Sequence, residues 1–216
     1  PRLFAENGRL LDSQGRITLD TPEALRALEN YRETYSYSDR TIYDFWKNAL
    51  EGFADGTAAM TVVFINYASH ILNSQMSRIA GKLGFAPVPG GKPLLGGGVI
   101  GITQSCTCPA AACKFLEWLY ADLVAPVFTM LGGLSPCRSA YSNRDISEQY
   151  PWLSTARKSF PTAQRRSNST YYQNFSELQL ETILAAHVQQ AVLGVCSPEE
   201  ALKQAQEDCN RYFQPW

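Results

Sequence analysis

Residues 53–67 read FADGTAAMTVVFINY, and this stretch decides the predicted fold. Trp46, Leu50 and the phenylalanine that opens the stretch recur at spacings of four and three, which is typical of the buried face of a helix. Gly56 supplies the positive-φ exit that ends such a helix. Residues 58–64 are small, β-branched or apolar and show no polar alternation, which predicts a strand covered on both faces. A helix followed by such a strand indicates an α/β fold.

Polar and aromatic side chains follow this predicted strand. In open α/β sheets, ligands bind outside the carboxyl ends of the strands, so Phe64, Asn66 and Tyr67 stand where a pocket is expected. Taken alone, the two aromatic residues are more typical of core or surface positions than of a wall that binds a ligand. Their place after a buried strand favours a role as flat walls for a ligand, with Asn66 supplying an in-plane amide.

Composition limits the possible functions. The chain has 216 residues, 45% of them apolar and 18% charged, which is ordinary for a globular protein with one or two lobes. The formal charge is −1, and apart from one small cluster there is no basic patch, so nucleic acid is not an expected partner. No apolar run approaches the ~18 residues that a membrane-spanning helix needs.

The six cysteines leave three interpretations open. They are even in number, but a chain of this length does not need disulfides, and none forms a C-x-x-C pair. Free thiols, one or more disulfides and, less favoured, a zinc site are all compatible with the spacing, although only His70 and His187 could add imidazole ligands. We predict no metal and no cofactor. Cys113 shares a predicted helix face with Leu116 and is expected to be buried and reduced.

Helix signals punctuate the rest of the chain. Residues 20–23, DTPE, predict a helix start with a capping residue, a first-turn proline and an acidic side chain, and that helix is expected to reach about residue 35. Residues 197–200, SPEE, predict a second capped start for a helix over 201–213. Further helices are expected over 69–80, from Pro109, from Pro151 and over 174–194, the last burying Leu178, Ile183, Leu184 and Val188.

One glycine-rich motif is misleading. Gly96, Gly98 and Gly101 match the G-x-G-x-x-G dinucleotide fingerprint, but that motif must follow a strand and open a helix. Here the glycines come before an alternating stretch that predicts a strand over 96–103. A nucleotide site is therefore not expected. Motifs for hydrolases, metalloproteases and phosphate-binding loops are also missing, so we do not expect an enzyme.

Several segments together resemble a known family. Phe53, Gly56, Ala58, Ala59 and Met60 match the F-x-x-G-x-A-A-M segment of the extracellular solute-binding proteins of bacterial ABC importers, in particular the sugar-binding branch. The same order of motifs continues with P-x-P-G near residue 87, a glycine-rich strand at 96–102, a G-x-x-P-x-R loop ending at Arg138, and the final capped helix. The resemblance covers about residues 4–213.

The resemblance implies a type II periplasmic-binding-protein-like fold with two hinged lobes. This chain would be its helix-rich second half: residues 1–93 in the C-terminal lobe, 94–131 crossing to the N-terminal lobe, and 132–216 again in the C-terminal lobe. The implied ligand-binding residues are Phe64, Asn66, Tyr67, Gly97, Gly98 and Arg138. Gly98 stands where an aromatic residue is common in the family, and Arg138 is equally compatible with a solvated surface charge.

The implied function is binding of a small solute, a sugar or oligosaccharide, for import through an ABC permease. The expected location is extracytoplasmic, with membrane attachment only through an anchor outside this segment. The alternative is a cytoplasmic sensor module of a transcriptional regulator with the same fold. Because proteins of this family are much longer, the chain is expected to be incomplete, with the strand over 96–103 covered elsewhere in a longer parent chain or left at an exposed edge.

Overall fold

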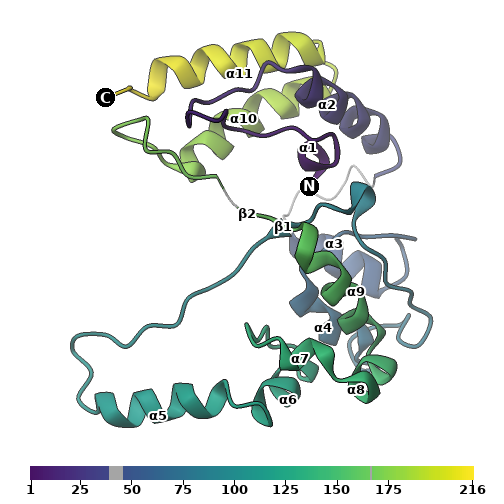
Figure 1. Ribbon diagram of the computed structural model, residues 1–216. Coiled ribbons are helices and arrows are strands. Elements are labelled where there is room, and N and C mark those ends of the chain that lie inside the picture. Colours follow the sequence, from purple (N-terminus) through teal and green to yellow (C-terminus); the bar gives the residue numbers. More distant parts are fainter. Residues whose placement is uncertain (39–45, 166) are drawn as a thin grey trace. The chain divides into compact units, whose positions relative to one another are not determined.

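The computed structural model describes residues 1–38, 46–165 and 167–216, and it divides into two compact units (Figure 1). The described residues of the first unit are 1–38, 88–96, 162–165 and 167–216. Those of the second unit are 46–87 and 97–161. The predicted boundaries lie after residue 93 and after residue 131, and the boundaries of the compact units fall elsewhere. The assignment of segments to lobes stays a prediction.

The first unit consists of long helices with very short strands. Its elements are α1 (Arg2–Ala5), α2 (Pro22–Tyr35), η2 (Pro89–Gly91), β1 (Leu94–Leu95), β2 (Gln164–Arg165), α10 (Glu177–Val192) and α11 (Pro198–Tyr212). The strands β1 and β2 pair in parallel, with Leu94 opposite Gln164. The irregular segment between α1 and α2, residues 6–21, is called the lead, and one antiparallel bridge between Leu11 and Ile17 closes it into a loop.

Side-chain caps start the three long helices of this unit. The Thr21 hydroxyl accepts a hydrogen bond from the Ala24 N–H at 3.2 Å, which confirms the predicted start of α2. Ser176 caps α10 in the same way. At α11, Ser197 and Glu200 form a capping box, in which each side chain accepts from the other residue's backbone N–H. These caps satisfy backbone donors that the helix itself leaves free.

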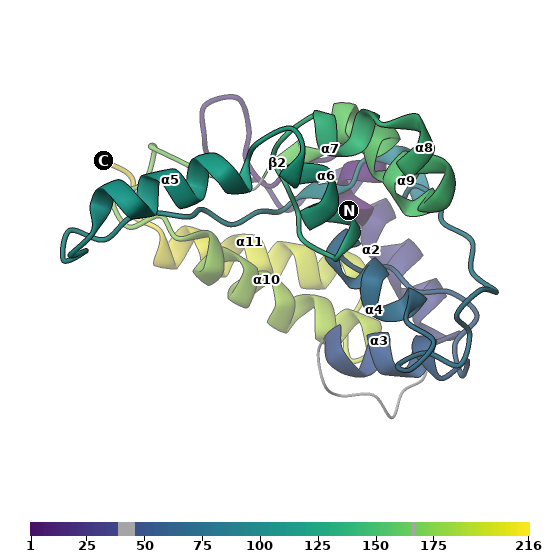
Figure 2. The same cartoon turned by 90° about the horizontal axis from the view of Figure 1, so that it is seen from below.

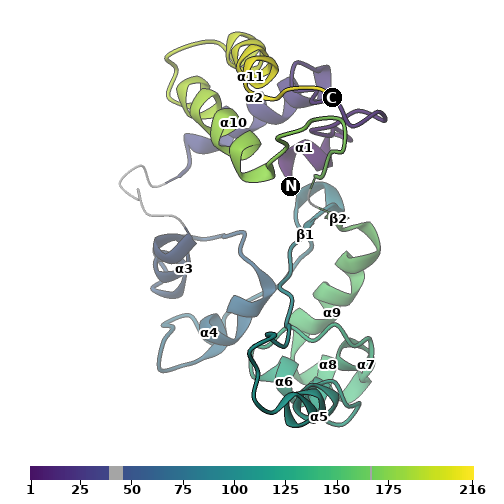
Figure 3. The same cartoon turned by 90° about the vertical axis from the view of Figure 1, so that its left-hand side faces the viewer.

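The three helices α2, α10 and α11 pack side by side (Figure 1, Figure 3). Two groups of buried side chains fill the space between them and the lead: Ile17, Leu19, Tyr172, Leu180, Ala205, Cys209 and Phe213 in one, and Ala24, Leu28, Ala191, Ala201 and Leu202 in the other. The expected burial of Leu178 is wrong, because its side chain is 74% exposed whereas Leu180 is fully buried. Helical patterns fix which residues share a face, but the neighbours decide which face is covered.

The second unit contains shorter helices joined by irregular segments. Its elements are α3 (Trp46–Ala54), η1 (Ile65–Tyr67), α4 (Ala68–Leu72), α5 (Pro109–Leu119), α6 (Val124–Met130), α7 (Ser139–Ser142), α8 (Arg144–Gln149), α9 (Pro151–Ser159) and η3 (Phe160–Thr162), the last reaching the boundary. The helices α7, α8 and α9 lie together (Figure 1, Figure 3). Their buried side chains join those of α4 and α6: Ala68, Ala125, Ala140, Tyr141, Trp152, Leu153 and Ala156.

The helix α3 ends as predicted. Gly56 has φ +81°, and both Leu50 and Ala54 are buried. The Ala54 carbonyl accepts a hydrogen bond from the Arg78 N–H at 2.8 Å, which fixes the end of α3 to a later segment. The predicted burial of Trp46 concerns a side chain outside the described residues.

The predicted buried strand over 58–64 is wrong. These residues form neither helix nor strand, and Met60 and Val62 are 88% and 66% exposed. A strand needs a neighbour that accepts its backbone hydrogen bonds, and no described residues form a ladder with this run. The helix expected over 69–80 is also shorter than predicted, because α4 ends at Leu72.

The predicted strand over 96–103 is likewise wrong. Described residues 96–108 contain no helix or strand, Val99 is completely exposed, and the trace before α5 runs without regular structure (Figure 2). The helix α5 starts at Pro109 as predicted. Cys113 on α5 is exposed, so its expected burial is wrong. Leu119 is the one buried residue of this described helix, so the buried face of α5 is narrow and does not include Cys113.

Candidate functional site

The segment 64–67 forms a short turn of 3₁₀ helix. Phe64 is extended, with φ −66° and ψ 142°, and its carbonyl accepts a hydrogen bond from the Tyr67 N–H at 3.0 Å. The chain continues directly into α4, whose residues Ala68 and Ile71 are buried. Phe64 is 51% exposed, and Asn66 is half-buried. These side chains therefore lie at the start of an anchored helix and not at the tip of a strand.

A loop distant in sequence packs directly against this turn. Gly132 has φ +96°, and a Cβ built on it would collide with the Ser69 side chain and lie 3.6 Å from the Asn66 carbonyl oxygen. Only glycine fits that backbone conformation and that close approach without strain. Ser69 is itself held by the turn, because its hydroxyl donates to the Asn66 carbonyl at 3.2 Å. The structure thus brings Asn66 and the start of the 132–138 loop together.

The same loop is fixed by hydrogen bonds of buried groups. Ser135 is buried; its hydroxyl accepts from the Cys137 N–H at 3.1 Å, and its carbonyl accepts from the Tyr141 hydroxyl at 2.9 Å. Burial raises the pKa of Tyr141, so its hydroxyl remains a neutral donor at physiological pH. The Cys137 thiol donates to the Tyr120 carbonyl at 3.4 Å. Because the loop is held at both Ser135 and Cys137, the next residue along the chain has a defined backbone position.

Arg138 directly follows Cys137 and is the N-cap residue of α7. Its carbonyl oxygen accepts from the Tyr141 N–H at 3.0 Å and from the Ser142 hydroxyl at 3.0 Å, which holds its backbone. Its side chain is exposed. A guanidinium group in this position is free to reorient towards a ligand with oxygen acceptors.

Gly97 and Gly98 are placed differently from the other predicted site residues. Both are exposed, and a Cβ at either position would meet nothing within 4 Å. The described structure therefore brings together the 64–67 turn and the 132–138 loop, whereas it leaves the two glycines in open surroundings. Ser69 and Gly132 are the contacts that the sequence motifs did not indicate. The sequence signal that could have indicated this contact is the pair Gly132-Gly133 after α6, because glycines often mark a close approach of two backbone segments.

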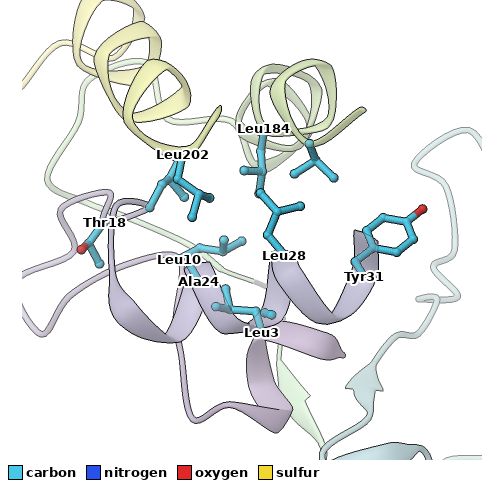
Figure 4. A pocket seen from close by; sticks show the side chains of 11 residues that line it. Leu3, Leu10, Thr18, Ala24, Leu28, Tyr31, Leu184 and Leu202 are labelled. Atoms are coloured by element: carbon cyan, nitrogen blue, oxygen red, sulfur yellow. The ribbon is translucent and has the colours of Figure 1, made fainter. Parts of the chain in front are cut away.

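A separate cavity of about 110 Å³ lies within the first unit (Figure 4). Leucine side chains from α1, α2, α10, α11 and the segment before α2 dominate its wall. Among its described lining residues, only Thr18 and Tyr31 carry a hydroxyl group, and that of Tyr31 points away from the leucines (Figure 4). The cavity is smaller than the ~300 Å³ at which small-molecule pockets begin. A sugar buried there would leave its hydroxyl groups without partners, so the cavity is a packing space.

The described residues hold neither a metal-binding cluster nor a membrane-spanning helix. No group of three or more His, Cys, Asp or Glu side chains in this part of the chain is arranged to hold a metal ion. No helix in the same part of the chain is both long and apolar enough to cross a membrane.

Comparisons with solved structures identify the fold. The chain is similar to the maltose-bound MalE3 protein of T. maritima, with a TM-score of 0.79 and 23% identity over 97% of this chain and 55% of that one. It is similar to an ABC transporter solute-binding protein of Agrobacterium radiobacter in complex with ribitol, with a TM-score of 0.70 and 22% identity over 98% of this chain and 56% of that one. A solute-binding protein of Agrobacterium vitis with bound D-mannitol gives a TM-score of 0.70 and 21% identity over 97% and 55%.

These similarities confirm the predicted periplasmic-binding-protein-like fold class. The chain spans little more than half the length of the structures that it matches. At the level of sequence, the family described as bacterial extracellular solute-binding protein matches residues 3–155, which is most of the chain. The protein therefore belongs to the family of bacterial extracellular solute-binding proteins.

Proposed function

We propose that this chain is part of a protein that binds a small carbohydrate, a sugar or oligosaccharide, and delivers it to an ABC permease from an extracytoplasmic location. The observation that carries the proposal is the similarity of nearly the whole chain to proteins solved with maltose, ribitol and D-mannitol. Because the chain covers about 55% of those proteins, the site needs further walls from sequence outside these 216 residues. No chemical step is part of this function.

The proposed contact surface in this chain is the 64–67 turn together with the 132–138 loop. A carbohydrate has apolar C–H faces and a rim of hydroxyl groups, so it needs flat aromatic walls and in-plane polar partners. Phe64 and Tyr67 would provide the aromatic faces. Asn66 and Arg138 would provide the amide and the guanidinium for the rim. Gly97 and Gly98 would contribute backbone groups only.

The rigid support of this surface is an argument for binding. The packing of Gly132 against Ser69 and the hydrogen bonds of Ser135 hold both segments before any ligand arrives. A surface that is ordered in advance loses less conformational entropy on binding. Loops carried on an anchored scaffold are also where binding residues tend to be found.

Titration calorimetry with maltose, ribitol, D-mannitol and D-tagatose tests the proposal, with a polyamine and an amino acid as unrelated solutes. We expect a carbohydrate to bind to a protein of full family length, and the 216-residue chain alone to bind it weakly or not at all. Equal affinity for the two proteins would show that the remaining walls are not needed. Binding of the polyamine or amino acid in place of every carbohydrate would overturn the proposed ligand class.

Substitutions test the surface itself. Phe64→Ala and Tyr67→Ala should each weaken carbohydrate binding by about 1 kcal/mol or more without loss of folding. Phe115→Ala is the matched control, because Phe115 on α5 is an exposed aromatic residue and is not part of the surface. Unchanged affinity in both aromatic variants would remove these residues from the site.

Arg138→Ala should weaken binding as well, and Arg157→Ala, an exposed arginine on α9, is its control. A loss of affinity in both arginine variants would indicate a general charge effect and not a contact of Arg138.

A further inference from the structure

The six cysteines fall into two groups with different surroundings. Cys209 is fully buried, and burial raises its pKa to about 11, so it stays a protonated and inert thiol at neutral pH. Cys137 and Cys196 are half-buried against packed side chains. Cys106, Cys108 and Cys113 instead fall within eight residues of each other, and two of these three are exposed.

The backbone between Cys106 and Cys108 changes direction. Cys106 closes a turn in which its N–H donates to the Thr103 carbonyl at 3.0 Å. The chain then bends at Thr107, the single residue between the two cysteines. Cys108 is the N-cap residue of α5, but its side chain caps no backbone donor there, so its thiol is not engaged by the helix start.

The short stretch of chain between the two cysteines limits how far apart their Cα atoms can lie. Two residues span at most about 7 Å when fully extended, and a bend shortens that span. A disulfide joins Cα atoms that are roughly 4.4–6.8 Å apart. The single residue between Cys106 and Cys108 therefore keeps their Cα atoms close to the range that a disulfide requires, without a large movement of the backbone.

Cys113 does not have the same reach to Cys108. It lies five residues further along, inside α5, and five residues of α-helix rise about 7.5 Å along the axis. That separation exceeds the roughly 6.8 Å limit for a disulfide without movement of the backbone. Cys113 is therefore an exposed thiol, like Cys108, that does not reach Cys108 without movement of the backbone, which makes it a suitable control.

We infer that Cys106 and Cys108 form a dithiol site that undergoes thiol–disulfide exchange and closes a reversible disulfide across Thr107. The co-reactant is a low-molecular-weight disulfide, RSSR. The Cys108 thiolate attacks one sulfur of RSSR, the S–S bond breaks, and one RS⁻ leaves. The Cys106 thiolate then attacks the Cys108 sulfur of the mixed disulfide, and the second RS⁻ leaves. Two protein thiols lose two electrons and two protons, and RSSR becomes two RSH.

The small ring explains why this disulfide should be reversible. A disulfide closed over one intervening residue departs from relaxed torsion angles, and strained or exposed disulfides are more easily reduced than buried structural ones. The exposed position of Cys108 gives the attacking thiolate the access that exchange requires. The pair is thus suited to cycling and less to permanent stapling.

The test exposes the 216-residue chain to oxidised glutathione, quenches with acid, alkylates without a reductant and identifies the peptides by mass spectrometry. We expect Cys106 and Cys108 to carry no alkyl label, and the peptide that contains them to be lighter by two hydrogens than the reduced peptide. Reduction with dithiothreitol before alkylation should give a label on both. The Cys113→Ser variant should behave in the same way. In Cys108→Ser, Cys106 should carry a label or a single glutathione and form no internal bridge.

Circular dichroism of each variant confirms that it is folded before oxidation. A bridge that includes Cys113, or full labelling of Cys106 and Cys108 after oxidation of the folded wild-type chain, would overturn the inference. A Cys106–Cys108 bridge that dithiothreitol does not open would overturn its reversible character.

Discussion

Helix α10 in the first unit and residues 97–103 in the second differ in how their backbone hydrogen-bonding groups are satisfied, although both are largely apolar. Within α10, the N–H groups after the first turn bond to carbonyls four residues earlier, and the Ser176 side chain caps the start. No hydrogen bond among the described residues uses a backbone N–H of 97–102, and their side chains are exposed. A helix completes its own hydrogen bonds, whereas an extended segment depends on a neighbour.

The same contrast explains why the proposed contact surface is well ordered. The 64–67 turn and the 132–138 loop are local structures that close on themselves and on each other. The extended segment 58–64 leading to that turn carries exposed apolar side chains at Met60, Val62 and Phe64. In a protein of full family length we expect such side chains to be covered, because contiguous exposed apolar surface marks an interaction site.

Hydrogen exchange should show the largest difference between the two regions. Amides in the middle of α10 should be protected up to the global free energy of unfolding, typically about 5–15 kcal/mol for a domain. Amides of residues 97–102 should exchange nearly as fast as in an unstructured peptide. Mass spectrometry or NMR after transfer to D₂O measures both. Strong protection of 97–102 in the 216-residue chain would mean that this segment is paired.

Truncation of one buried leucine should have the next largest effect. Leu180→Ala removes a fully buried side chain between α10 and α11, so we expect a loss of about 2–5 kcal/mol in the free energy of unfolding. Leu178→Ala, on the same helix but 74% exposed, should change stability by no more than about 0.5 kcal/mol. Urea denaturation measures both, and similar losses in the two variants would contradict the observed orientation of α10.

Removal of a cap should cost less. Ser197→Ala deletes the side chain that accepts from the Glu200 N–H at 3.1 Å, and we expect a loss of about 0.5–2 kcal/mol. Ser74→Ala, at an exposed loop position, is the control and should be nearly neutral. Thermal and urea unfolding provide the comparison. An unchanged free energy of unfolding in Ser197→Ala would mean that α11 does not need its capping box.

The smallest expected effect concerns pH. Hydrogen bonds from the Arg16 N–H, the Arg16 side chain and the Gln14 N–H lower the pKa of Asp12. A carboxyl group whose pKa is lowered by folding stabilises the protein above its unfolded pKa, and this contribution is lost as the pH falls through its folded pKa.

Asp12→Asn should therefore reduce stability slightly at neutral pH and make no difference at strongly acidic pH. Asp122→Asn, at an exposed position in the second unit, should show no such dependence. Unfolding by urea at a series of pH values tests both. A larger deficit of Asp12→Asn in acid than at neutral pH would contradict the direction of the pKa shift.

Sequence reasoning succeeded where the signal is local. The starts of α2, α5, α9 and α11 were predicted from a capping residue or a proline at the first position, and the end of α3 from Gly56. The order of short motifs was enough to identify the family that the match over 3–155 confirms. The residues proposed for the site stay predictions, and the contact between Gly132 and Ser69 was not anticipated.

The sequence by itself determined the starts of α2, α5, α9 and α11, the end of α3, and the family, because a cap, a first-turn proline or a positive-φ glycine acts within about four residues of the chain. Only the tertiary structure decided that Leu180 and not Leu178 is buried, that Cys113 is exposed, and that the runs 58–64 and 96–103 are not strands. Each of these depends on which distant segment lies opposite. Burial of a helix face and pairing of a strand are interactions between partners, and the pattern of one partner does not contain the position of the other.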